Sequence, residues 1–260
     1  MTSAASADLG IMPEWDLSDL YVSPAAPEVN RDLEKGAVDA KALKEKYQGR
    51  LLEIGSDGAK LAQAVKSYEA LSDLLGKLGS YAGLLYAANQ IDPQRAKFYG
   101  DVSEKLTAIS SDLLFFELEL NKIEDDVLAA ALKHPELARY KPWFDDLRKE
   151  KPYQLEENIE QLFHEKGQTG RGAWNRLFNE TMSALRFDVE GHDVPLTLEP
   201  TLNLMSDPKR DKRQAGAEAL AKVFKDNVRL FTLITNTLAK DKEISDRWRG
   251  FKDVADSRHL

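Results

Sequence analysis

The sequence predicts a mainly α-helical protein, a multi-helix bundle that forms a lobe and carries one short β-hairpin at about residues 186–198. Two observations lead to this prediction. Apolar side chains recur every three or four residues along most of the 260-residue chain, which is the spacing of amphipathic helices. Between about 186 and 198 this spacing gives way to the apolar and polar alternation that is typical of strands.

The first part of the chain predicts a leader followed by one helix. Residues 1–12 contain neither a basic start nor an apolar run, so we expect a mobile leader rather than a signal peptide. Pro24 and Pro27 prevent an early helix. We expect the first helix to span about 28–47 and to end near Gly49.

Two long helices are then expected to pack as an antiparallel hairpin. The first covers about 57–89, and Asp92 with Pro93 provides a cap and a first-turn proline for the second. The apolar seam of the second helix alternates steps of four and three residues, at Phe98, Val102, Leu106, Ile109, Leu113, Phe116 and Leu120. Such a seam packs on neighbouring helices. A coiled-coil spacer is the alternative, although sustained e and g charge pairs are missing.

Shorter helices are expected to complete the bundle. Prolines and the glycines between 167 and 172 separate them. We expect these helices at about 124–137, 155–166 and 173–185. The segment 140–148 carries two aromatic residues behind a proline, and we expect it to dock against the bundle.

The last part of the chain changes period and then becomes helical again. Phe187 and Val189 alternate with acidic residues before a turn, and Pro195 restricts the second arm of the expected hairpin to an edge. The segment 206–208 is expected to cap a final helix that reaches about Trp248. The predicted parts are therefore a leader at 1–12, a helical lobe at 13–185, and a hairpin plus long helix at 186–260.

Composition excludes several classes of partner. The 36 Lys and Arg residues are outnumbered by 44 Asp and Glu residues, which gives a net charge of -8. This balance argues against nucleic acid as the main partner. No apolar run approaches the roughly 20 residues that span a bilayer, so we expect no membrane partner and a cytoplasmic protein. The absence of cysteine rules out disulfides and thiolate metal sites.

No catalytic or metal-binding residue is predicted. His164 and Glu165 supply the first two residues of an HExxH zinc motif, but Gln168 occupies the position of the second histidine. His192, Lys209 and Arg210 are candidate ligand contacts. His192 lies at the expected hairpin tip, and Lys209 and Arg210 begin a charge run at a helix start, where cations oppose the helix dipole. Solvated surface positions are the alternative for all three.

Several short stretches carry a family resemblance through their order and spacing. They are Trp15–Tyr21 (WDLSDLY), Tyr47–Leu51 (YQGRL), Lys151–Glu157 (KPYQLEE), Gly172–Phe178 (GAWNRLF) and Trp248–Gly250 (WRG). From Trp15 onward the chain resembles the N-terminal part of the M3 family of zinc metallopeptidases, in the oligoendopeptidase F branch. In that family the zinc ligands and the catalytic glutamate lie in a later catalytic domain, and no residue here matches them.

The resemblance implies a substrate-enclosing lobe of a zinc-dependent oligoendopeptidase that hydrolyses short, unfolded peptides. It implies zinc in the full-length enzyme and none in these 260 residues, which are expected to be inactive alone. Residues 186–260 would lead toward a catalytic domain absent from this chain, and His192, Lys209 and Arg210 would line the peptide channel. Two alternatives stay open: a non-catalytic helical interaction module, and a regulatory domain that binds a small ligand between helices.

Overall fold

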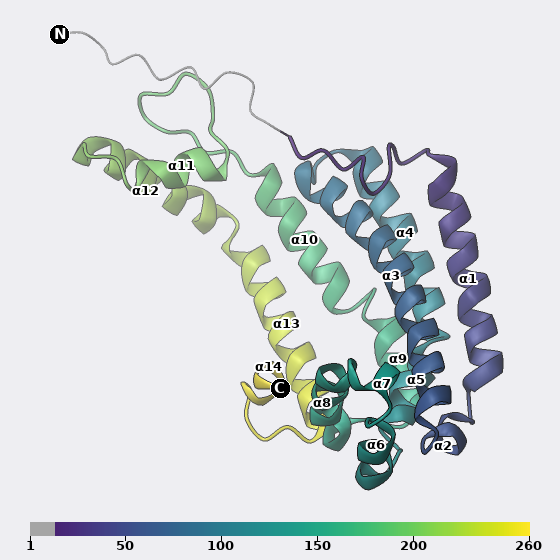
Figure 1. Ribbon diagram of the computed structural model, residues 1–260. Helices are drawn as coiled ribbons and strands as arrows, with labels where there is room; N and C mark the ends of the chain where they lie inside the picture. Colours follow the sequence, from purple (N-terminus) through teal and green to yellow (C-terminus); the bar gives the residue numbers. More distant parts are fainter. Residues whose placement is uncertain (1–13) are drawn as a thin grey trace.

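A computed structural model describes residues 14–260 (Figure 1). The expected leader at 1–12 lies outside the described residues. Helices account for 73% of the structure, so the predicted mainly α-helical class is confirmed. Within the described part of the chain, no helix is both long enough and apolar enough to cross a membrane.

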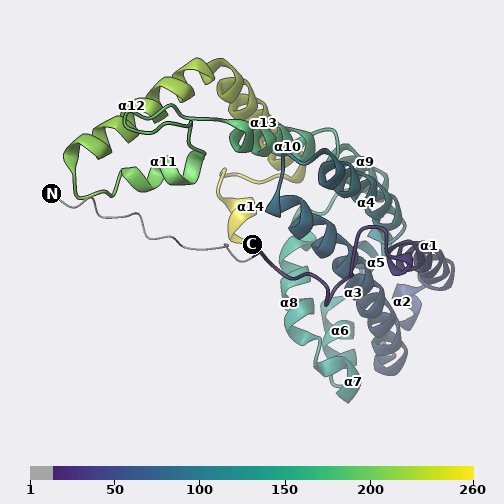
Figure 2. The ribbon, with the colours of Figure 1, turned by 90° about the horizontal axis from the view of Figure 1, so that it is seen from above.

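Three long helices form the body of the bundle. They are α1 (Pro27–Tyr47), α3 (Gly58–Ala88) and α4 (Pro93–Ser111). The predicted cap residue Asp92 acts as expected, because its side chain accepts from the Gln94 and Arg95 N–H groups, and the Asp57 side chain caps α3 in the same way by accepting from the Ala59 and Lys60 N–H groups. α3 packs against both α1 and α4 (Figures 1 and 2), so the predicted hairpin of two long helices is present.

The apolar seam of the second long helix is divided between two helices. Asp112 and Leu113 form a turn between α4 and α5 (Leu114–Leu120). Their N–H groups bond to the carbonyls three residues earlier, those of Ile109 and Ser110, and the Asp112 carboxylate pairs with Lys44 at 2.7 Å. The seam nevertheless continues into the core through the turn, because Leu113, Phe116 and Leu120 are buried.

Shorter elements close the lower end of the bundle. They are α2 (Leu51–Ile54), α6 (Asp125–Ala131), α7 (Pro135–Ala138), α8 (Lys141–Glu150), the 3-10 turn η1 (Lys151–Tyr153) and α9 (Glu157–Lys166). Phe144 on α8 is buried in the main core, as expected for the docking segment. Tyr68 on α3 stacks on Phe116 with ring centroids 4.4 Å apart, which joins the long and short helices in one core.

The remaining helices extend beside and beyond the bundle. They are α10 (Arg171–Ala184), α11 (Leu198–Leu204), α12 (Arg210–Asp226), α13 (Val228–Arg249) and α14 (Asp256–His259). α10 lies beside α13. α11 packs on α12 at the end of this group of helices that is far from α14 (Figures 1 and 2). A small separate core around Phe187 and Leu220 stabilises that far end.

The prediction of a β-hairpin at 186–198 is wrong, because this segment does not form two paired strands. Only one antiparallel bridge forms, in which Phe187 and Leu196 exchange two backbone hydrogen bonds of 2.9 Å. Pro195 has no N–H to extend the ladder, and α11 begins at Leu198. The alternation reflects burial of Phe187 and Val189 on the α12 side rather than strand pairing.

The predicted single final helix is two helices. Its start is displaced to Arg210, because the Asp207 carboxylate accepts from the Lys209 N–H at 2.8 Å and forms a turn before the helix. Asn227 then separates α12 from α13. Its side-chain amide donates to the Val223 carbonyl at 2.9 Å, and its own φ and ψ of -103° and 5° depart from helical geometry.

Candidate functional site

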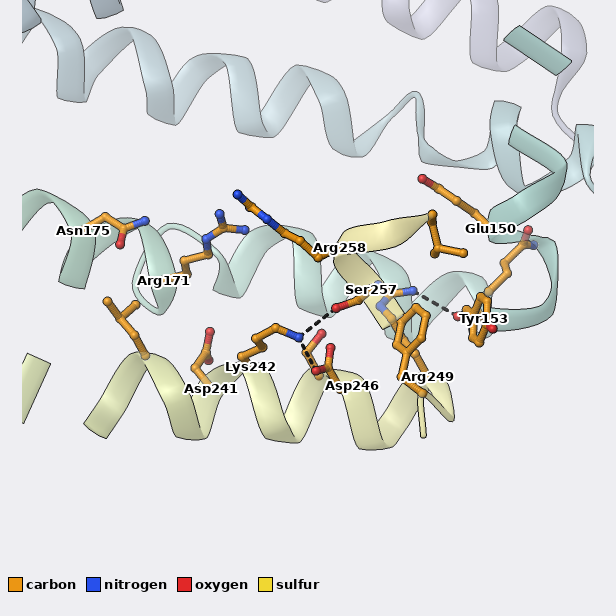
Figure 3. A pocket seen from close by; sticks show the side chains of 15 residues that line it. Glu150, Tyr153, Arg171, Asn175, Asp241, Lys242, Asp246, Arg249, Ser257 and Arg258 are labelled. Carbon is orange, nitrogen blue, oxygen red and sulfur yellow. Dashed lines mark hydrogen bonds and ion pairs between the residues drawn. The ribbon is translucent and has the colours of Figure 1, made fainter. Parts of the chain in front are cut away.

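A cavity of about 560 Å³ lies between α10, α13, α14 and the end of α8 (Figure 3). Its wall combines charged groups with an apolar patch. A smaller hollow of about 390 Å³ shares four residues with it, Arg171, Asp241, Ser245 and Arg249. The two hollows are therefore neighbours along α13, and together they are called the cleft.

Arg249 lines both hollows of the cleft. Its guanidinium forms two hydrogen bonds with the Glu160 carboxylate, at 2.6 and 2.7 Å, and a third with the Tyr153 carbonyl at 3.2 Å. Burial acts to raise the pKa of Glu160, but the hydrogen bonds from Arg249 and from the Leu155 N–H outweigh it, so the pKa lies below its ordinary value of 4.5. Both groups are therefore charged at neutral pH.

An aromatic contact continues the same wall. The Tyr153 and Phe251 rings stack with centroids 4.0 Å apart. Gly250 makes this contact possible, because its φ of 81° reverses the chain directly after α13. The KPYQLEE and WRG stretches, far apart in sequence, thus meet at the cleft.

Lys242 connects α13 to α14. Its ammonium group contacts the Asp246 carboxylate and donates to the Ser257 hydroxyl at 2.8 Å (Figure 3). The Asp256 carboxylate accepts from the N–H groups of Lys252 and Asp253. These contacts hold the short α14 helix across the opening of the cavity.

Arg171 and Arg258 extend into the cavity from opposite elements, the start of α10 and α14 (Figure 3). Within residues 14–260, neither guanidinium has an ion pair or a side-chain hydrogen bond, whereas Lys242 and Arg249 are both paired. The cavity therefore contains two unpaired cations.

The residues singled out from the sequence lie elsewhere. His192 is exposed in the loop of the single bridge, Lys209 is the N-cap of α12, and Arg210 is its first residue. None of the three lines the cavity. Their contact with a peptide stays a prediction.

His164 has a structural contact at the end of α9. Its Nε2 lies 3.2 Å from the Thr107 carbonyl oxygen on α4. Among the described residues, no group of three or more His, Asp or Glu side chains is placed to hold a metal ion.

Comparisons with known proteins show similarity to oligoendopeptidases in one segment and in the fold. Residues 119–187 match a family model described as Oligopeptidase F, N-terminal region. A crystal structure of oligoendopeptidase-F from Enterococcus faecium has a TM-score of 0.78 and 18% identity, and the match covers 89% of this chain and 46% of that one. A second match, to a provisionally assigned peptidase from Chlamydophila abortus, has a TM-score of 0.53 and 14% identity over 94% of this chain and 41% of that one.

The family match covers residues 119–187, and the two solved structures are similar to the chain in fold. The similarity of that segment is to the oligopeptidase F type. The chain spans less than half the length of the two solved structures described above. The search of curated proteins found no match.

Arg171 and Arg258 were not predicted as site residues. Arg171 lies in the glycine-rich segment 167–172, whose spacing indicated only a helix break, and Arg258 lies on a four-residue helix. No local pattern brings these two positions together. Their common feature, the lack of an acidic partner, is visible only in the folded chain.

Proposed function

We propose that this chain is the substrate-enclosing lobe of a zinc-dependent oligoendopeptidase that cleaves short, unfolded peptides. The observation that carries the proposal is the family match at 119–187, which lies inside a fold like that of oligoendopeptidase-F. The cleft along α13 supports it, because a channel for an extended peptide needs polar groups together with an apolar patch.

In this proposal the described residues shape the substrate and do not perform the chemistry. α10 and α13 form one wall of the peptide channel, and the bundle behind them keeps that wall rigid. A narrow channel admits an extended chain and excludes a folded domain. His192, Lys209 and Arg210 would contact more distant parts of a peptide near α11 and the start of α12.

Zinc would be bound by residues of the parent enzyme outside the 260-residue chain. The described side chains do not fit a zinc site, since they provide no converging set of three ligands. We therefore assign no catalytic step to zinc within this chain.

Reading the coding DNA beyond the codon for Leu260 tests this proposal. We expect an open frame that encodes HExxH roughly a hundred residues or more downstream. A stop codon directly after Leu260 would contradict the proposal. It would favour a non-catalytic interaction module, for which the exposed apolar side chains of α13, such as Leu233 and Trp248, would provide a contact surface.

A further inference from the structure

We propose that Arg171 and Arg258 bind the C-terminal carboxylate of a peptide that lies in the cleft along α13. The identity of the ligand as a peptide rests on the proposed function. The position of the charged subsite rests on the cavity itself.

Both arginines are held by well-anchored elements. Arg171 is the first residue of α10, directly after the glycine-rich turn in which the Gly170 N–H donates to the Lys166 carbonyl at 2.7 Å. Arg258 follows Ser257, whose hydroxyl is held by Lys242 on α13. The two arginines therefore line one cavity from two anchored elements, α10 and α14 (Figure 3).

The charges of the cavity leave these two cations without a partner. Arg249 is neutralised by Glu160 and Lys242 by Asp246. Glu150 interacts electrostatically with Arg249, and the Asp241 carboxylate lies beside Gly170 at the start of α10, where the helix dipole stabilises a negative charge. A bound anion would give both guanidinium groups a partner.

A carboxylate suits this arrangement better than a phosphate. Planar guanidinium groups bind carboxylates through paired hydrogen bonds. The carboxylates of Glu150 and Asp241 also line the cavity and would repel a doubly charged anion more strongly than a single carboxylate. The stacked Tyr153 and Phe251 rings offer an apolar surface for the last side chain of a peptide.

The rest of the peptide would lie in the adjoining hollow of about 390 Å³. This hollow continues the cleft past Arg171 toward Phe163 and His164 on α9. A peptide anchored by its C-terminus at the two arginines could therefore extend along α13. The site would select short peptides with a free carboxylate near the bound segment.

The test is fluorescence anisotropy of one neutral pentapeptide, labelled at its amino terminus and prepared as the free acid and as the C-terminal amide. We expect the 260-residue chain to bind the free acid roughly tenfold or more tightly than the amide, since hydrogen bonds to charged groups contribute at that level. The variants Arg171→Gln and Arg258→Gln should each weaken free-acid binding by roughly tenfold and leave amide binding unchanged.

Arg229→Gln is the matched control, because Arg229 is exposed on α13 and does not line the cavity. It should leave both affinities unchanged, and unaltered amide binding by the Arg171 and Arg258 variants would show that they are folded.

Equal affinity for the acid and the amide would overturn the carboxylate subsite while leaving peptide binding intact. Binding of neither peptide would overturn the subsite and count against the peptide-enclosing function as well. Displacement of the acid by inorganic phosphate near the peptide's own Kd would overturn the choice of a peptide carboxylate.

Discussion

Arg249 and Glu160 join two parts of the chain that are 89 residues apart in sequence. Their side chains are mostly shielded from solvent, with 25% and 13% of their surface exposed. A two-pronged ion pair in such a place differs from a surface pair, because removing one partner leaves the other buried without compensation. This contact therefore stabilises the position of the C-terminal end of α13 on α9.

Replacing Arg249 by Leu should lower the free energy of unfolding by about 1–3 kcal/mol, because Glu160 would lose its partner. Urea denaturation at neutral pH, followed by circular dichroism, measures this change. Arg247→Leu is the control on the same turn of α13. Its pair with Glu243 is exposed, so we expect little change. Equal effects of the two substitutions would contradict the structural role of Arg249.

The same ion pair predicts that the stability of the folded chain depends on pH. The pKa of Glu160 is lower in the folded chain than its ordinary value of 4.5, so its contribution to stability is complete above that value and is lost as the pH falls through the folded-state pKa. The stability difference between the unmodified chain and Arg249→Leu should therefore shrink on acidification below about pH 4.5. Denaturation curves across that range measure it. A difference that stays constant there would show that Glu160 is not the titrating partner.

At the scale of the element, two glycines of α3 have different surroundings. A Cβ atom at Gly58 would lie 2.5 Å from the His134 Cβ and 2.7 Å from the Ala131 carbonyl oxygen, whereas one at Gly76 would meet nothing within 4 Å. The start of α3 thus approaches the α6–α7 connection more closely than any other residue type permits. The middle of α3 has no such restriction.

Alanine substitution at these two positions should therefore have opposite effects. Gly58→Ala should destabilise the chain by about 1–3 kcal/mol through overpacking. Gly76→Ala should stabilise it by about 0.5–1 kcal/mol, because glycine is unfavourable in a helix interior. Thermal unfolding of both variants provides the comparison. A loss of stability in both would indicate that Gly76 is also in a tight contact.

Elements with a long apolar period could be predicted from the sequence, and elements set by tertiary contacts could not. The seam from Phe98 to Leu120 indicated a buried helical face because its spacing repeats over several turns. The turn at Asp112 was missed, since it depends on a partner on α1, Lys44. The alternation near Phe187 indicated strands, but α11 and α12 bury that segment instead.

At the scale of the whole molecule, the resemblance predicted the family, whereas the cavity had to be found in the structure. The order of short stretches such as KPYQLEE and WRG indicated an oligopeptidase lobe, and the fold explains their relation, because Tyr153 and Arg249 meet in one wall. The pairing of Arg249 on α13 with Glu160 on α9 has no counterpart in local sequence. The boundary between the helical lobe at 13–185 and the segment 186–260 stays a prediction.

The proposed function assigns the enclosure of a peptide to these residues and the zinc chemistry to other residues of the parent enzyme. The most direct measurement is the zinc content and the turnover of a quenched fluorescent peptide, for the metal-dialysed 260-residue chain and for the complete gene product, before and after zinc addition. We expect zinc-dependent turnover by the complete product, and neither stoichiometric zinc nor turnover in the 260-residue chain. Stoichiometric zinc together with peptide cleavage by the 260-residue chain would contradict the account.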